Sequence, residues 1–184
     1  MKRIYTFAAV IAAVFAFAFT AVEARSLNAP SSKPTQSIEQ QVNKKIHMLT
    51  NYGVFDHITF QVNGGVVTLN GKVNSLGTKS EAAASVKRIP GVEQVINNIE
   101  NLPPSGFDDS IRVRTLRTLE RGGLGGYFWE ANPDVRIIVK NGHVTLEGYV
   151  MNSGDRNRAN ILANGVSGVF SVTNNLIVGE EKKS

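Results

Sequence analysis

The chain of 184 residues is 42% hydrophobic and 19% charged, which is typical of a globular protein with one or two domains and excludes a membrane bundle or a wholly disordered chain. It contains no cysteine, so disulfides, thiolate metal sites, cysteine nucleophiles and a lipid-modified N-terminal cysteine are excluded. The formal net charge of +5 points weakly to anionic partners.

Residues 1–24 have the pattern of a secretory signal peptide. Lys2 and Arg3 precede an apolar run over residues 4–21, and a cleavage site ends at Ala24. We therefore expect export to the periplasm, with a mature net charge of +4. An uncleaved membrane anchor is the alternative, because the run approaches the roughly 18 to 20 residues that span a bilayer. Both alternatives place the rest of the chain outside the cytoplasm.

The first predicted element after the signal is a helix. Residues 25–36 are rich in Ser and Pro and predict a flexible leader. Ser37 and Gln40 then have the spacing of a capping box, which marks the start of a helix. Its apolar residues recur at helical spacing and are Ile38, Val42, Ile46 and Leu49.

Alternating apolar and polar residues follow and predict a β-hairpin over residues 58–73, with a turn at Asn63-Gly64. An Ala-rich stretch predicts a second helix over residues 79–89, which ends at Pro90-Gly91. Residues 92–99 are rich enough in β-forming residues to predict a third strand. The predicted order of elements is therefore α-β-β-α-β.

The sequence repeats itself at an offset of 77 residues. Residues 62–99 and 139–176 share 14 identities over 38 aligned positions, whereas chance predicts about two or three. The identical pairs include Gly65 and Gly142, Gly71 and Gly148, Gly91 and Gly168, and Asn97 and Asn174. An internal repeat of this strength indicates two copies of one structural unit.

The second copy predicts the same order of elements, with helices near 109–121 and 155–164 and strands near 134–140, 143–150 and 169–178. We expect an α+β fold of two tandem α-β-β-α-β domains, each a three-stranded mixed sheet with two helices on one face. Each copy is small enough to be only marginally stable alone, so we expect the copies to pack on each other. The predicted boundaries are 1–24 for the signal, 25–36 for the leader, 37–103 for the first domain, 104–107 for the linker, 108–180 for the second domain and 181–184 for a charged tail.

The repeated residues have mainly structural interpretations. We expect the glycines to serve turn geometry and close approach between elements. Asn97 and Asn174 fall inside predicted strands, where Asn is disfavoured, so we expect their side chains to bond neighbouring backbone groups.

The doubled pattern resembles the BON domain family. The resemblance rests on Gly-x-Val-Thr-Leu-x-Gly-x-Val from Gly65 to Val73 and on Gly-Val-x-x-Val-x-Asn from Gly91 to Asn97, both met again 77 residues later. It covers roughly residues 37–180 and implies a periplasmic protein with two BON domains, as in osmotically inducible exported proteins. The resemblance implies binding to phospholipid or protein surfaces and protection of the envelope under stress, without catalysis. Lipoprotein relatives carry a cysteine at the cleavage site, and this chain does not.

The second copy has a candidate lipid-binding surface that the first copy lacks. Arg114, Arg117 and Arg121 fall within an arc of about 60° on the first helix of that copy. The helix is followed by an irregular, flexible glycine stretch that ends in Tyr127-Phe128-Trp129. Arginine binds phosphate in a forked geometry, and Trp or Tyr settles at headgroup depth, so this combination suits an anionic bilayer.

A simpler interpretation stays open for the same residues. The arginines could form a solvated face, and the aromatic residues could fill the gap between the two domains. Arg112 complicates the basic face, because helical spacing directs it between Leu116 and Leu119, toward the expected core.

Other functional classes find little support. The three histidines, His47, His57 and His143, lack metal-ligand spacing, and the acidic residues resemble helix starts and a solvated tail. We therefore expect no enzyme activity, no cofactor, no metal and no small-molecule substrate. Nucleic acid is not an expected partner, because the chain is predicted to be exported and has no Gly-x-x-Gly loop between helices. The expected partner is an anionic phospholipid surface, and the alternative is a chaperone-like role on envelope proteins.

Overall fold

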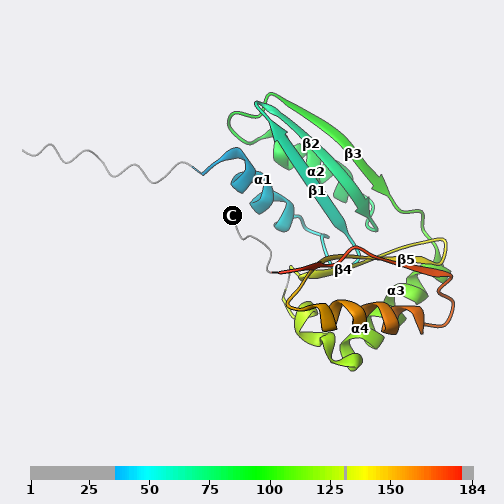
Figure 1. Ribbon diagram of the computed structural model, residues 1–184. Coiled ribbons are helices and arrows are strands. Elements are labelled where there is room, and N and C mark those ends of the chain that lie inside the picture. Colours follow the sequence, from blue (N-terminus) through cyan, green and yellow to red (C-terminus); the bar gives the residue numbers. More distant parts are fainter. Residues whose placement is uncertain (1–35, 131, 180–184) are drawn as a thin grey trace, which may run out of the picture. The chain divides into compact units, whose positions relative to one another are not determined.

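The computed structural model describes residues 36–130 and 132–179. The predicted signal peptide, nearly all of the leader and the charged tail lie outside the described residues. The first repeat contains α1 (Ile38–His47), β1 (His57–Asn63), β2 (Val66–Val73), α2 (Thr78–Lys87) and β3 (Gln94–Asn101). The second contains α3 (Gly106–Leu119), two further helical turns, β4 (Val135–Lys140), β5 (His143–Val150), α4 (Ser153–Asn164), β6 (Ser171–Asn174) and β7 (Ile177–Val178) (Figure 1).

Helix α1 begins where the capping box predicted. The Ser37 side chain accepts a hydrogen bond from the backbone N–H of Gln40, and the Gln40 side chain accepts one from the backbone N–H of Ser37. These two bonds satisfy donors that the first turn of a helix leaves without partners. Val42 and Ile46 are buried on the apolar stripe, and this confirms the predicted helix face.

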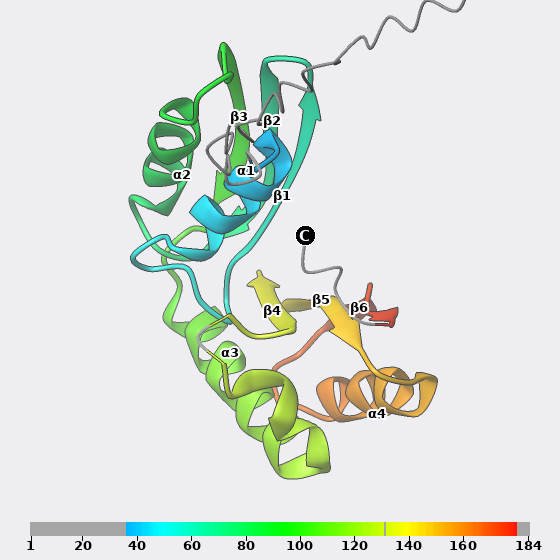
Figure 2. The same cartoon turned by 90° about the vertical axis from the view of Figure 1, so that its left-hand side faces the viewer.

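The first sheet has the order β1-β2-β3, with β1 antiparallel to β2 and β3 parallel to β2. Its inward side chains, including Val67, Leu69 and Ile99, form one core with those of α1 and α2. Figure 2 shows the two helices beside each other on one side of the three strands. The outward side chains of β1 are polar and exposed, as the alternating pattern predicted.

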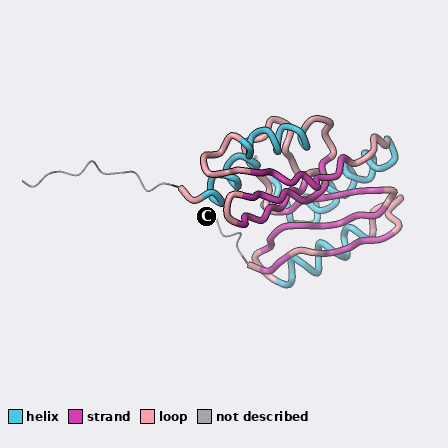
Figure 3. The backbone as a smooth tube through the Cα atoms, turned by 90° about the horizontal axis from the view of Figure 1, so that it is seen from above, coloured by secondary structure: helices cyan, strands magenta, loops and turns pink. Residues whose placement is uncertain are grey.

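The second repeat has the same plan with one difference. Strand β5 pairs antiparallel with β4 and parallel with β6, and β7 pairs with the end of β5. The prediction of a single strand over residues 169–178 is therefore wrong in detail. Two short strands, β6 and β7, lie in this segment, and the second sheet has four strands. The break lies at Asn175-Leu176, where the buried Leu176 donates its N–H to the side chain of Asn174. Helices α3 and α4 cover one face of this sheet (Figures 1 and 3).

The glycine stretch after α3 also differs from the prediction. Glu120–Leu124 and Gly125–Phe128 form helical turns, with a kink at Gly123, whose φ is 89°. Leu124 is buried in the second core, and a Cβ on Gly122 would overlap the side chain of Leu162 in α4. The stretch expected to be irregular thus forms helical turns, because glycines here allow the chain to turn closely against α4; its flexibility stays a prediction.

Strand β4 is buried on both of its faces. Val135, Ile137 and Val139 belong to the second core, and Arg136 and Ile138 on the opposite face are also buried. A strand with one free face would alternate between buried and exposed residues, as β1 does. The cover for the second face comes from the first repeat.

The contact between the repeats involves the segment after α1. The N–H of Ile137 donates to the carbonyl oxygen of Val54 at 2.8 Å, and the side chains of Val54 and Phe55 pack against the second core. An ion pair between Lys140 and Glu100, 2.5 Å apart, links the repeats at a second point. The repeats are thus in direct contact, as we expected for units of this size.

Candidate functional site

The basic stripe of α3 faces solvent. Arg114, Arg117 and Arg121 are all exposed. In residues 36–130 and 132–179, no ion pair joins any of the three to an acidic side chain. Asp109, which is close in sequence, pairs instead with the buried Arg112. The stripe therefore presents three uncompensated positive charges to the surroundings.

Arg112 lies in the core, as its helical position predicted. It is 1% exposed, and its guanidinium donates one hydrogen bond to the carbonyl oxygen of Val139 at 2.7 Å and another to Asp109. A buried charge requires such partners, because transfer from water to the protein interior is costly. Arg112 thus holds α3 against β4 and takes no part in the exposed stripe.

The aromatic residues after the glycines separate into two groups. Tyr127 and Phe128 are half-buried and pack against the second core, whereas Trp129 is 84% exposed. The Tyr127 hydroxyl donates to Asp155 at 2.6 Å and accepts from the N–H of Met151 at 3.0 Å. Burial, and then the Asp155 carboxylate, raise the pKa of the Tyr127 phenol. Trp129 is therefore the most exposed of the three, while Tyr127 and Phe128 remain partly exposed.

The alternative in which these aromatic residues fill the gap between the repeats stays a prediction. Tyr127 and Phe128 pack against the second core, and so do Val54 and Phe55 of the first repeat. Tyr52 of the first repeat lies at the junction as well, with its ring centroid 4.5 Å from the guanidinium carbon of Arg136. Arg136 is 4% exposed and also donates to the carbonyl oxygen of Gly53 at 2.7 Å and to the side chain of Asn132.

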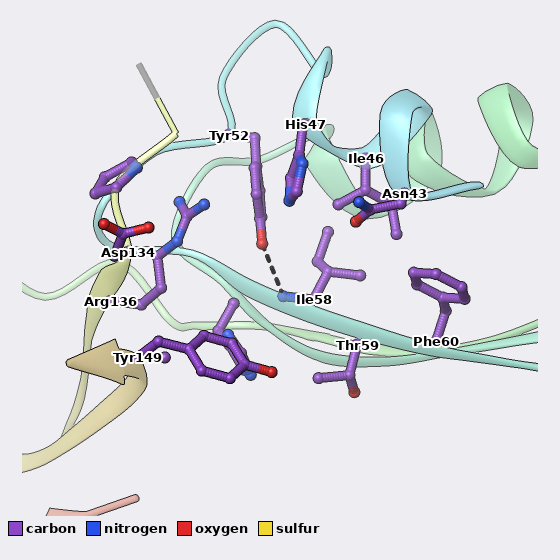
Figure 4. Close-up of a pocket in the computed structure, with 13 residues that line it drawn as sticks. Asn43, Ile46, His47, Tyr52, Ile58, Thr59, Phe60, Asp134, Arg136 and Tyr149 are labelled. Carbon is purple, nitrogen blue, oxygen red and sulfur yellow. Dashed lines mark hydrogen bonds between the residues drawn. The ribbon is translucent and has the colours of Figure 1, made fainter. Parts of the chain in front are cut away.

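A cleft of about 250 Å³ lies at this junction. Figure 4 shows Tyr52 and Arg136 among the side chains that line it. Asp56 lies close to the same junction and is buried; its carboxylate accepts from the N–H groups of Gly53 and Asn74. Burial raises the pKa of this carboxyl, although those bonds and the nearby Arg136 oppose the change. Because the guanidinium of Arg136 is already engaged by the protein, we assign this cleft a structural role.

Sequence reasoning missed Phe107, which continues the basic stripe. Residues 107, 114 and 121 are spaced by seven, so they lie nearly in line along the helix. Phe107 is 48% exposed. The predicted helix began near residue 109, but α3 begins at Gly106 with Ser105 as its N-cap, and this earlier start places Phe107 on the stripe. The seven-residue spacing was the signal that could have revealed it.

Residues 34–103 and 108–180 each match the model of the BON domain. The chain belongs to the BON domain family. Two solved structures of CdsD, a structural protein of the type III secretion system of Chlamydia trachomatis, are similar to it at 15% identity. The structure of the CdsD C-terminal domain aligns over 80% of this chain and 100% of the CdsD chain, with a TM-score of 0.30. The second CdsD structure aligns over 79% of this chain and 94% of the CdsD chain, with a TM-score of 0.29. No curated protein matches the chain.

The glycines shared by the two BON domains lie where a side chain would be obstructed. Gly71 and Gly148 have φ values of 135° and 108°, and a Cβ on either would lie about 2 Å from a carbonyl oxygen, that of His57 in β1 or that of Asp134 just before β4. Gly91 and Gly168 both have a φ of 88° in the turn before the last strand of their domains. These positions favour glycine in both copies.

The shared asparagines join β3 of the first BON domain to α2 and β6 of the second BON domain to α4. The Asn97 amide donates to the carbonyl oxygen of Lys79 in α2, and the Asn174 amide donates to that of Arg156 in α4. The side-chain oxygen of Asn97 also accepts a hydrogen bond from the backbone N–H of Ile99. In the same way, the side-chain oxygen of Asn174 accepts one from the backbone N–H of Leu176. Both side chains are therefore engaged by the backbone of their own domain.

The described part of the chain offers no sign of a metal centre or a membrane span. Within residues 36–130 and 132–179, no group of three or more His, Asp or Glu side chains could hold a metal ion. None of the helices in the same ranges is long and apolar enough to cross a bilayer.

Proposed function

We propose that the protein is an exported, non-catalytic envelope protein that binds anionic phospholipid surfaces through its second BON domain. The observation that carries the proposal is the line of three exposed arginines, Arg114 and Arg117 on α3 and Arg121 in the helical turn that follows it, without ion-pair partners among the described residues. BON domains are often linked to binding of membranes and phospholipids. A role in envelope integrity during osmotic stress is part of this proposal.

The chemistry of the stripe suits lipid phosphate. A guanidinium is planar, stays charged and can donate two parallel hydrogen bonds to one phosphate. Each basic residue near an anionic membrane contributes about 1 kcal/mol, so three give weak binding that salt screens. Trp129, at the far end of the stripe, adds an indole that prefers the headgroup region. We therefore expect reversible association with the surface rather than anchoring.

The proposed location follows from the N-terminal sequence. A signal peptide over residues 1–24 directs the chain to the periplasm, and cleavage near Ala24 releases it. The chain has no cysteine for lipid attachment, so its contact with the membrane depends on the folded domains. Weak binding by a few charges is consistent with a protein that samples the envelope surface.

Flotation with vesicles tests the proposal. The mature chain is expected to float with vesicles that contain phosphatidylglycerol at low salt, and to remain unbound with phosphatidylcholine vesicles. A variant with Arg114, Arg117 and Arg121 changed to Ala is expected to lose most of this binding. Absence of flotation with both kinds of vesicle would contradict the proposal.

The matched control removes the same charge from the first BON domain. Lys44, Lys45 and Arg88 are exposed, and their replacement by Ala is expected to leave most of the binding intact. Equal loss in both triple variants would indicate a simple effect of net charge rather than a site on α3. Pull-down from envelope extract at high salt addresses the alternative function, because apolar contacts with protein clients survive conditions that screen phosphate binding.

A further inference from the structure

Two exposed phenylalanines lie together at the N-terminal end of α3. Phe107 and Phe170 are 48% and 68% exposed, and their ring centroids are 5.9 Å apart. The ring of His143 lies 5.9 Å from that of Phe170, edge to face. We refer to Phe107, Phe170 and His143 as the aromatic patch. Both phenylalanines are exposed large apolar residues of the second domain, and neither belongs to its buried core.

The patch is held in place by two glycine turns. A Cβ on Gly142 would lie 2.6 Å from the ring of Phe170, and a Cβ on Gly168 would lie 3.4 Å from the ring of Phe107. Both glycines have positive φ, at 78° and 88°. The ring of Phe170 therefore rests directly on backbone where a side chain would displace it, and the ring of Phe107 lies close to Gly168, so both rings are packed before any partner binds.

The first BON domain carries a different surface at the equivalent turns. Glu93, 77 residues before Phe170, covers Gly65 in the way that Phe170 covers Gly142. Ile38 covers Gly91, the counterpart of Gly168. The shared scaffold thus accepts a charged, water-soluble side chain at the position of Phe170. Because folding does not require an aromatic ring there, the exposed pair calls for a functional explanation.

The basic stripe begins at the aromatic patch. A nitrogen of the Arg114 guanidinium would lie 3.3 Å from a Cβ on Gly168, the same glycine that Phe107 contacts. Arg117 and Arg121 continue from Arg114 away from the patch. A cation beside exposed aromatic rings matches the boundary between phosphate and acyl chains, where the charge meets the headgroup and the rings enter the apolar layer.

We propose that the aromatic patch inserts into the boundary between headgroups and acyl chains of an anionic bilayer, while Arg114 binds the lipid phosphate. This proposal rests on the proposed function and adds the depth and orientation of binding: the N-terminal end of α3 and the turns at Gly142 and Gly168 face the membrane. The occupant is a bilayer rather than a second protein surface, because the adjoining residues of α3 supply a row of cations that complements anionic lipid.

Site-specific labelling tests the insertion directly. Because the chain has no native cysteine, a single Phe170→Cys change allows one fluorescent label (NBD) to be placed on the patch. Glu93→Cys places the same label on the equivalent turn of the first BON domain and serves as the control. Anionic vesicles with nitroxide groups on their acyl chains are expected to quench the label at position 170 and to leave the label at position 93 unaffected.

Each result has a defined meaning when flotation of the same labelled chains is measured in parallel. Flotation without quenching at position 170, or with equal quenching at both positions, overturns the insertion and leaves the proposed function standing. Absence of flotation of the unlabelled mature chain overturns both. A change in label emission that depends on protein concentration without vesicles shows contact between copies of the chain, and it also overturns the insertion.

A charge substitution gives an independent measurement. Phe170→Glu introduces the residue that the first BON domain carries at this turn, so the fold is expected to persist with an unchanged melting temperature. Affinity for anionic vesicles is expected to fall about tenfold, because one apolar ring no longer leaves water and one negative charge is added. Unchanged affinity of a folded variant would overturn the insertion.

Discussion

Replacement of Arg136 by Met tests whether the two BON domains depend on each other for stability. The guanidinium donates a charged hydrogen bond to Gly53 across the junction, for which about 1.5 to 3 kcal/mol is typical. Its position over the ring of Tyr52, 4.5 Å from the centroid, adds about 0.5 to 2 kcal/mol. Met retains the apolar stem, so the expected loss is dominated by these two interactions. We expect the free energy of unfolding to fall by about 2 to 5 kcal/mol.

Urea unfolding of the mature chain, followed by circular dichroism at neutral pH, measures this loss. Arg117→Met is the matched control, because it makes the same chemical change at an exposed position and is expected to cost less than about 0.5 kcal/mol. Hydrogen exchange adds a local measurement. The N–H of Ile137, which donates to Val54 of the first domain, is expected to exchange faster in Arg136→Met, while amides within β5 change less. A loss below about 1 kcal/mol, or an unchanged Ile137 amide, would refute the reasoning.

Three further predictions concern backbone geometry and ionisation. Gly148→Ala is expected to cost more than about 2 kcal/mol in thermal unfolding, because its Cβ would lie 1.9 Å from a carbonyl oxygen, whereas Gly126→Ala, with open space around it, is the tolerated control. The pKa of Asp56, measured by NMR, is expected to lie above the ordinary aspartate value. The stabilisation that comes from this raised pKa is present at low pH and is lost as pH rises through the raised pKa. The free energy of unfolding of wild type is therefore expected to increase relative to that of Asp56→Asn as the pH is lowered. Asp155→Asn is expected to lower the pKa of Tyr127 in an absorbance titration, and an unchanged midpoint would argue against the assigned cause.

Much of the fold could be predicted because its determinants are local and occur twice. The capping box at Ser37, the alternation along β1 and β2 and the shared glycines each specify backbone geometry within a few residues. The doubled sequence then shows that one plan serves both domains. The broken third strand of the second domain escaped prediction, because residues 169–178 have the same apolar pattern as a continuous strand.

The junction was harder to predict, since it depends on contacts between residues more than 80 positions apart. One signal was present. Residues Val135 to Val139 read Val-Arg-Ile-Ile-Val, and a strand that is apolar at successive positions is typical of burial on both faces. The sequence does not say what covers the second face. Tyr52 and Val54 lie in a loop without periodicity, so nothing local directs them across to β4.

The candidate site was predicted in part for a similar reason. Helical geometry alone fixes the spacing of Arg114, Arg117 and Arg121, and the structure places all three in solvent. The direction of Tyr127 and Phe128 depends on the kink at Gly123 and on packing against α4, which no pattern in the segment specifies. Tertiary contacts override local expectation wherever glycine permits several backbone paths.

The division of surfaces between the two BON domains gives a physical reason to seek function on α3. In the second domain, the face of β4 that points away from the helices is covered by the first domain, so its helices carry much of the surface left free. In the first domain, the corresponding face of β1 is exposed and polar, and the turn that carries Phe170 in the second domain carries Glu93. The second domain, whose β4 is covered by the first domain, is therefore also the domain that combines arginines without ion-pair partners with exposed aromatic rings on its helical side. If the first domain serves chiefly to cover β4, Arg136→Met should weaken vesicle binding only through the stability of the second domain, and Phe170→Glu should weaken it without any loss of stability.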